Sequence, residues 1–305
     1  MTDGISTPSN ATKVPKLIGI GVLFIFCIVL MTLTKLPEVR ITGFLQGMVQ
    51  SALDPYGIYL SDHGRQLSFL KGLTYTLDHP TLELADQTRI EFDDLTVRPK
   101  LLMLLTGKMG VSARLHQGAS EIALDAGGKG DKIDASLSLQ DIDLGKLGVL
   151  AFAAGLKGGG IISGTGHIDG ALSDLSTLNG NLDFKLKKIH LDEQNLMGFQ
   201  IPSINVSEGD LTIEIRSGKL VIKSVQIGKG TDDLRVSVSG DMALNRNLNS
   251  SALNLRAVLG ISDKVKQSFS ILESILGSAK MSDGRYAYKL TGSLAAPMPI
   301  PDPGK

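Results

Sequence analysis

Five histidines are the first candidates for chemistry, and they are spread along the chain at His63, His79, His116, His167 and His190. A helix that grips a metal ion usually presents two ligands four residues apart, as in H-x-x-x-H. No two of these histidines stand at that spacing. We therefore expect each to lie on a surface or a strand face, and we expect no metal site and no cofactor.

The richest glycine stretch, Gly158–Gly166, does not match a phosphate-binding loop. It lacks the Lys-Ser or Lys-Thr ending of such loops. It also comes before an expected strand, whereas a phosphate loop runs from a strand into a helix N-terminus. The stretch predicts a bend that enters a strand, and Gly228–Thr231 fails the same test.

Acidic residues occur as neighbours, Asp93-Asp94 and Asp232-Asp233, rather than at a spacing that suits acid–base catalysis. Adjacent residues of a strand point to opposite faces, so they do not form a paired acid and base. The G-x-S-x-G motif of a nucleophile elbow is also absent. The sequence contains no positive sign of an enzyme, and turn or surface roles suffice for these residues.

Composition narrows the possible partners. The chain has 31 basic and 31 acidic residues and no basic run, so nucleic-acid binding has no electrostatic support. The single cysteine, Cys27, leaves the rest of the chain without a disulfide. The 35 glycines suit many turns and bulges.

From Tyr56 onward, alternating apolar and polar residues predict strands, each with one apolar and one polar face. The clearest case is a hairpin in which two alternating runs meet at Ser217-Gly218. Its apolar residues, with those of the next strand, form either an open groove that could line acyl chains or an ordinary closed core. These eight candidates are Leu211, Ile213, Ile215, Leu220, Ile222, Leu234, Val236 and Val238.

Three segments have helical periodicity, at about 41–53, 144–156 and 263–276. Asp143 is an expected N-cap for the second helix and Ser262 for the third. The fold class expected is mainly β: an elongated, twisted, antiparallel-rich sheet or open sandwich with two or three short helices. The proline-rich tail, 297–305, is expected to be extended and mobile.

An uncharged apolar run, Leu17–Leu33, precedes all of these elements. As a helix extended to Leu36 it would span about 30 Å, the thickness of a bilayer core. It is longer than a signal-peptide core and no A-x-A cleavage site follows it, so an uncleaved signal anchor is favoured. The predicted organisation is a cytoplasmic head (1–16), a transmembrane signal anchor (17–36), a periplasmic β-rich domain (37–296) and the tail. Flanking lysines and arginines are nearly balanced and give this orientation little support.

Four segments together resemble the type II secretion system protein N family. They run in the family's order, from a strand that ends in a leucine-rich turn to a closing glycine–tyrosine strand. The segments are Val97–Lys108, Leu156–Gly158 with Ser163, Gly164 and Gly180, Gly198–Pro202, and Asp283–Pro297. The layout is more distantly similar to AsmA-like proteins.

The first resemblance implies a single-pass protein of the bacterial inner membrane with a periplasmic body, accessory to protein export and without catalytic residues. Its partners would be the inner membrane and other type II secretion components. The second implies lipid binding or transfer along an apolar sheet groove. Apolar strand faces covered by the helices near 144–156 and 263–276 would favour an adaptor, whereas an open face would favour lipid.

Overall fold

The structure is a computed structural model, and it describes most of the chain from Tyr59 to Gly304. The residues described are 47, 50, 54, 59–68, 73–84, 88–148, 150–151, 155–171, 173–196, 199–268 and 271–304. The predicted head and transmembrane anchor, and most of the helix expected at 41–53, lie outside these residues. Within them, none of the helices has the length and apolar character needed to cross a membrane. The chain divides into two compact units, Met1–Ala52 and Leu53–Lys305.

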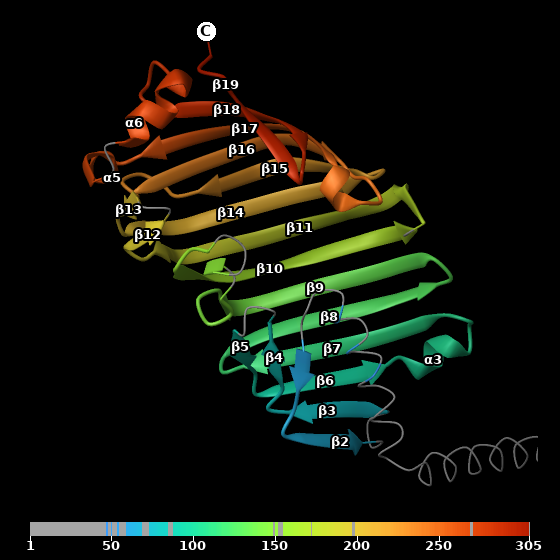
Figure 1. The fold of residues 1–305 in the computed structure, drawn as a ribbon. Helices are drawn as coiled ribbons and strands as arrows, with labels where there is room; N and C mark the ends of the chain where they lie inside the picture. Colours follow the sequence, from blue (N-terminus) through green and yellow to red (C-terminus); the bar gives the residue numbers. More distant parts are fainter. Residues whose placement is uncertain are drawn as a thin grey trace, which may run out of the picture. The chain divides into compact units, whose positions relative to one another are not determined.

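The second unit is built on one antiparallel sheet of fourteen strands, in the order β19-β18-β17-β16-β15-β14-β11-β10-β9-β8-β7-β6-β3-β2. Figure 1 shows these strands stacked in that order as a single twisted layer. The strands are β2 (Gly64–Ser68), β3 (Thr74–Asp78), β6 (Asp94–Pro99), β7 (Met109–Gln117), β8 (Ser120–Lys129), β9 (Lys132–Asp143), β10 (Gly158–Ala171), β11 (Asp174–Leu191), β14 (Ile204–Arg216), β15 (Lys219–Ile227), β16 (Leu234–Ala243), β17 (Ala252–Ile261), β18 (Tyr286–Ser293) and β19 (Ala296–Pro301). The mainly β prediction is confirmed.

Smaller elements interrupt this series. Two small sheets are β1 (Tyr59–Ser61) with β4 (Thr81–Glu83) and β5 (Arg89–Glu91), and the hairpin of β12 (Gln194–Leu196) with β13 (Phe199–Ile201). The short helices are α3 (Leu101–Leu104), α5 (Asp263–Ser268), α6 (Ile271–Leu276), η2 (Leu248–Ser250) and η3 (Gly277–Ala279).

The predicted hairpin forms at the predicted turn. Arg216 pairs with Lys219, which leaves Ser217 and Gly218 as a two-residue loop with φ of 50° and 72°. Positive φ at both positions is the type I′ geometry whose twist matches that of paired strands. A side chain at Gly218 would also run into the carbonyl oxygen of Leu175, so glycine is required there.

The helix expected at 263–276 is confirmed as α5 and α6, and Val265 N–H donates to the capping Ser262 Oγ over 3.4 Å. The helix expected at 144–156 is wrong over 144–148, which form hydrogen-bonded turns. Gly145 and Lys146 donate their N–H groups to Asp143 Oδ1, so the cap forms. Gly148 then adopts a φ of 61°, which is outside the helical conformation. The helical spacing of the apolar residues around it did not indicate this break.

The tail is extended, as predicted, but residues 296–301 form an edge strand, β19, that pairs with β18 instead of a free end. Its prolines occupy alternate positions: Pro297, Pro299 and Pro301. Successive backbone groups of a strand point in opposite directions, so all three missing N–H groups belong on the outer side. The residues between them keep their N–H groups for β18, and Asp302 N–H continues the series to the Ala287 carbonyl over 2.9 Å.

Some of the buried apolar residues form two small clusters towards the ends of the sheet, and others, such as Leu178 and Ile215, are buried in the middle strands. One cluster contains Ile261, Val265, Ala279 and Tyr286, beneath α5 and α6. The other contains Leu84, Ile90 and Phe92, where the β1-β4-β5 sheet meets Leu115 of β7 and Leu147. The middle strands lie between these clusters.

Candidate functional site

All eight predicted apolar candidates lie on one face of the sheet. Residues paired across antiparallel strands project to the same side. Ile213 pairs with Ile222 and Ile215 with Leu220, which places the two strands of the predicted hairpin on a common face. Further pairings add Leu211 with Val225, Val225 with Val238, Ile227 with Val236, and Leu234 with Ile261.

Sequence reasoning missed Val225 and Ile227 because a bulge interrupts β15. The register shifts between Ile222 and Val225. Lys223 and Ser224 occupy the extra step, and the apolar alternation resumes in the opposite phase. A strict period of two therefore stops at Ile222, although the same face continues to the end of the strand.

The same face is apolar across nearly the whole sheet. We define this apolar face by three rows of mutually paired residues, which contain apolar residues, glycine and the rings of two tyrosines. The first row ends at Leu77, because its partner in β2 is Arg65. The first row is Leu77, Leu95, Leu115, Ile122, Leu139, Gly164, Phe184, Leu211, Val225, Val238, Ala257, Tyr288 and Pro301. The second row is Leu67, Tyr75, Val97, Ala113, Leu124, Leu137, Gly166, Leu182, Ile213, Ile222, Gly240, Leu255, Leu290 and Pro299. The third row is Pro99, Val111, Ala126, Ala135, Ile168, Gly180, Ile215, Leu220, Met242 and Leu253.

The second row crosses all fourteen strands. At the usual spacing of about 4.8 Å between strands, it is about 60 Å long. The three rows together are on the order of 14 Å wide, because alternate residues of a strand are about 7 Å apart. This is the outline of a strip that could hold an extended hydrocarbon chain.

The opposite face is polar. One row that crosses it contains Thr96, Arg114, Ala123, Ser138, Thr165, Asp183, Thr212 and Ser224. Ion pairs also lie on this side, such as Lys223 Nζ with Glu214 Oε2 at 3.0 Å. The sheet therefore separates a water-compatible surface from an apolar one.

The described elements leave the middle of the apolar face without an extended cover. Leu137, Leu182 and Ile213, in the central strands, remain only half-buried, and Leu124 is 38% exposed. Of the elements expected to cover the strands, α5 and α6 pack at the end near Leu234 and Leu259. In the described part of the chain, the two clusters that pack against this face lie around Leu234 and Leu259 and around Leu115. Ile215, in the third row, is 5% exposed.

Glycines of β10 let large side chains of β11 lie flat on the apolar face. A Cβ at Gly164 would approach the Phe184 Cδ1 atom to 2.7 Å, and one at Gly166 would approach Leu182 Cδ2 to 2.6 Å. The glycine-rich stretch lies within β10, with a register shift between Gly159 and Ile161. Its effect is to make room for apolar surface.

The structure brings some of the predicted polar candidates together in pairs, and His63 Nδ1 lies 3.3 Å from the His79 carbonyl oxygen. His116 Nδ1 is 3.1 Å from Asp94 Oδ2, and His167 Nδ1 is 3.1 Å from Ser136 Oγ. Asp93 accepts the Gly118 N–H and so serves a turn. No group of three possible metal ligands occurs within the described part of the chain.

Asp232 and Asp233 fasten the turn between β15 and β16 to the start of β14. Asp233 Oδ2 accepts hydrogen bonds from Asn205 N–H at 3.0 Å and Lys264 Nζ at 3.1 Å. Asp232 Oδ2 accepts from Ser207 N–H at 3.0 Å. Burial alone would raise both pKa values, but the combined hydrogen bonds outweigh it and lower the pKa of each carboxyl.

The fold and the apolar face together define a one-layer amphipathic sheet. Comparisons with protein-family models, with curated proteins and with solved structures find no match to the chain.

Proposed function

We propose that this protein is a non-catalytic, inner-membrane-anchored, periplasmic accessory component of a type II secretion system, and that its contribution is to hold lipid acyl chains along the apolar face. The binding activity and the biological setting have separate support, and separate experiments test them.

The continuous apolar face carries the proposal of lipid binding. Exposed apolar patches of a few hundred Å² already mark interaction sites on monomeric proteins. A strip about 60 Å long and on the order of 14 Å wide encloses roughly 800 Å², about two to three times that size, although residues near its ends such as Tyr75 and Leu77 are buried. An acyl chain suits it because hydrocarbon needs no hydrogen-bond partner, and, apart from the hydroxyls of Tyr75 and Tyr288, the three rows offer apolar side chains and glycine.

The type II secretion setting rests on the family resemblance and on where its segments lie. Val97–Lys108 spans the end of β6, α3 and the turn into β7, and Asp283–Pro297 leads through β18 into β19. The segments that resemble the family therefore lie at turns of the same sheet, from one end of the sheet to the other. It implies export of folded proteins as the process served and adds no catalytic residue.

Site-specific photo-crosslinking tests the lipid-binding part in the full chain in living cells. A photoreactive phenylalanine analogue is placed at Leu211, on the apolar face, in cells grown with radioactive phosphate. We expect labelled phospholipid adducts at Leu211 and none at the neighbouring Thr212, on the polar face. Equal labelling at both positions, or none at either, would contradict lipid binding.

Deletion of the gene tests the secretion part. We expect lower export of folded substrates, restored by the unchanged chain but not by Leu182→Glu. Normal export after deletion would exclude the secretion role. Should lipid adducts persist in that case, the protein would be an AsmA-like lipid-binding or lipid-transfer protein outside the secretion system.

A further inference from the structure

The corner between β6 and β7 exposes several large apolar side chains. Leu101 is 42% exposed, Leu102 81%, Leu105 84% and Met109 72%. Single exposed leucines are ordinary on protein surfaces. Four such residues within nine positions form an exposed apolar tip that requires a partner or a solvent other than water.

Hydrogen bonds and one buried contact hold this corner in place. Lys100 N–H donates to the Gly110 carbonyl over 2.8 Å, and Lys108 N–H donates to the Met103 carbonyl over 3.0 Å. Met103 packs on the polar face of the sheet, where a Cβ at Gly127 would lie 3.1 Å from its Cε. Since Met103 fills the contact with the sheet, Leu102 and Leu105 are left to project outward.

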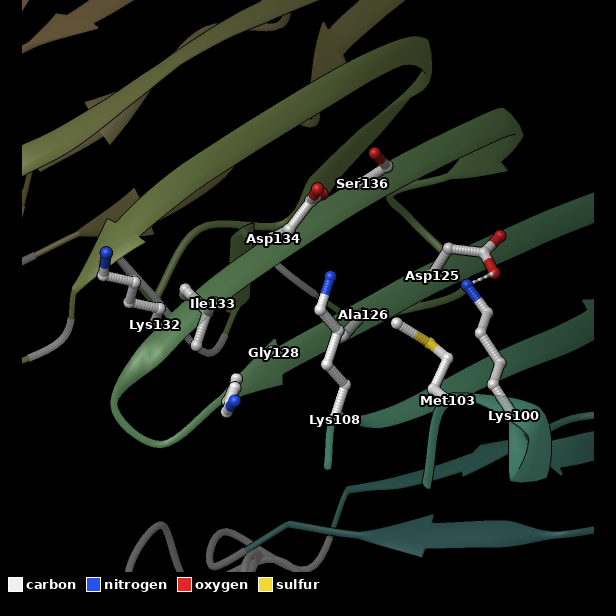
Figure 2. A pocket seen from close by; sticks show the side chains of 12 residues that line it. Lys100, Met103, Lys108, Asp125, Ala126, Gly128, Lys132, Ile133, Asp134 and Ser136 are labelled. Atoms are coloured by element: carbon white, nitrogen blue, oxygen red, sulfur yellow. Dashed lines mark ion pairs between the residues drawn. The ribbon is translucent and has the colours of Figure 1, made fainter. Parts of the chain in front are cut away.

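Basic side chains surround the same corner. Figure 2 shows Lys100, Lys108 and Lys132 around a recess of about 400 Å³ beside α3, where Lys100 Nζ lies 2.9 Å from Asp125 Oδ1. Lys129 also lines this recess, from the turn between β8 and β9.

The local charge is positive. Within the described part of the chain, Arg98, Lys108, Lys129 and Lys132 form no ion pair, whereas Lys100 is neutralised by Asp125. Two further carboxylates lie close by, Asp131 in the turn between β8 and β9 and Asp134 in the lining of the recess. They oppose those four cations, which leaves a net charge of +2. An apolar tip bordered by cations is complementary to an anionic membrane surface.

We propose that this corner, residues 98–109 with the turn at 129–132, docks on the surface of an anionic lipid bilayer. Leu101, Leu102 and Leu105 enter the boundary between headgroups and acyl chains, and the lysines extend to lipid phosphates. This contact is separate from the predicted anchor at 17–36 and does not require lipid on the apolar face.

The absence of tryptophan from the chain allows a direct test. The full chain carrying Leu105→Trp is reconstituted into bilayers of phosphatidylcholine, with or without phosphatidylglycerol, that contain brominated acyl chains. We expect bromine quenching of the tryptophan in anionic bilayers. Replacement of Lys108, Lys129 and Lys132 by Gln should lower docking on the order of a hundredfold, because each cation near an anionic surface contributes about 1 kcal/mol.

Leu248→Trp is the matched control, since Leu248 begins the short helix η2, is 56% exposed and lies outside this corner. Quenching at position 105 that requires anionic lipid, without quenching at 248, supports the proposal. Absent quenching at 105, equal quenching in neutral bilayers, or equal quenching at 248 overturns it. A shielded tryptophan that bromine does not quench also overturns it, because the corner would then be covered by protein.

Discussion

At the scale of single residues, Gly164 determines how closely β10 and β11 can approach. A Cβ there would lie 2.7 Å from the Phe184 Cα, and its φ of 155° is one that other residues rarely adopt. We expect Gly164→Ala to destabilise the protein by roughly 1–3 kcal/mol, because the backbone must shift to relieve the overlap. Chemical denaturation of the full chain measures this loss.

Gly277→Ala is the control, since a Cβ there would meet no atom within 4 Å. Its unfolding midpoint should stay close to that of the unchanged chain. An equal shift for both variants would show that the alanine substitution itself, rather than the approach of Phe184, determines stability.

Asp233 predicts a particular dependence of stability on acid. Its hydrogen bonds hold its pKa below the ordinary value of 3.8. A carboxyl with a lowered folded-state pKa stabilises the protein above its unfolded pKa, and this contribution is lost as pH falls through the folded pKa. We therefore expect Asp233→Asn to lower the melting temperature at pH 7, and the difference from the unchanged chain to shrink below about pH 4.

Thermal melts of the full chain between pH 7 and pH 3 measure that difference. Asp263→Asn is a suitable control, because the Asp263 side chain is 89% exposed. A difference for Asp233→Asn that stays constant down to pH 3 would contradict the role assigned to its charge.

At the scale of elements, the alternation of prolines in β19 explains how the sheet ends. An edge strand with free N–H and C=O groups invites pairing with another chain. Replacement of Pro297, Pro299 and Pro301 by Thr would restore three outward N–H groups. We expect the triple variant to self-associate with increasing concentration, as measured by light scattering after size-exclusion chromatography.

The control for this edge prediction keeps the prolines and changes the side chains between them. Met298→Thr with Ile300→Thr alters exposed apolar surface but no backbone donor. That double variant should behave as the unchanged chain. Self-association of the control but not of the proline variant would assign the protection to side chains instead.

The elements also show what sequence can predict. The strand faces around Ile213 and Ile222 follow from a period of two, which is a local property of the chain. The bulge before Val225 breaks that period, so the continuation of the face depends on pairing with Val238 in another strand. The sequence did not predict β19 as a strand for a related reason. Its prolines are compatible with a strand only at the edge of a sheet, and the residues of one segment do not show whether it lies at an edge.

At the scale of the whole second unit, continuity of the apolar face matters more than any single residue. Each strand of the large sheet contacts mainly its two neighbours, as in a repeat protein. The alternation of apolar and polar residues predicted, for each strand separately, one apolar face and one polar face. It did not predict that three rows would stay in register across the sheet, because register depends on turns and bulges along the whole chain.

Continuity distinguishes a protein that conducts lipid from one that only stores it. If acyl chains move along the rows, a charge at Ile213 should interrupt them, because a carboxylate on the path must be desolvated as the hydrocarbon passes. We expect Ile213→Asp to lower photo-crosslinking of lipid at only one of Leu137 and Ala257, the position beyond the block from the lipid source, and to leave the signal at the other position unchanged. Thr212→Asp, on the polar face of the same strand, should leave both signals unchanged.

Loss of lipid at position 213 with normal signals at 137 and 257 would indicate separate static sites. Transfer requires the signal to fall on the side farther from the lipid source.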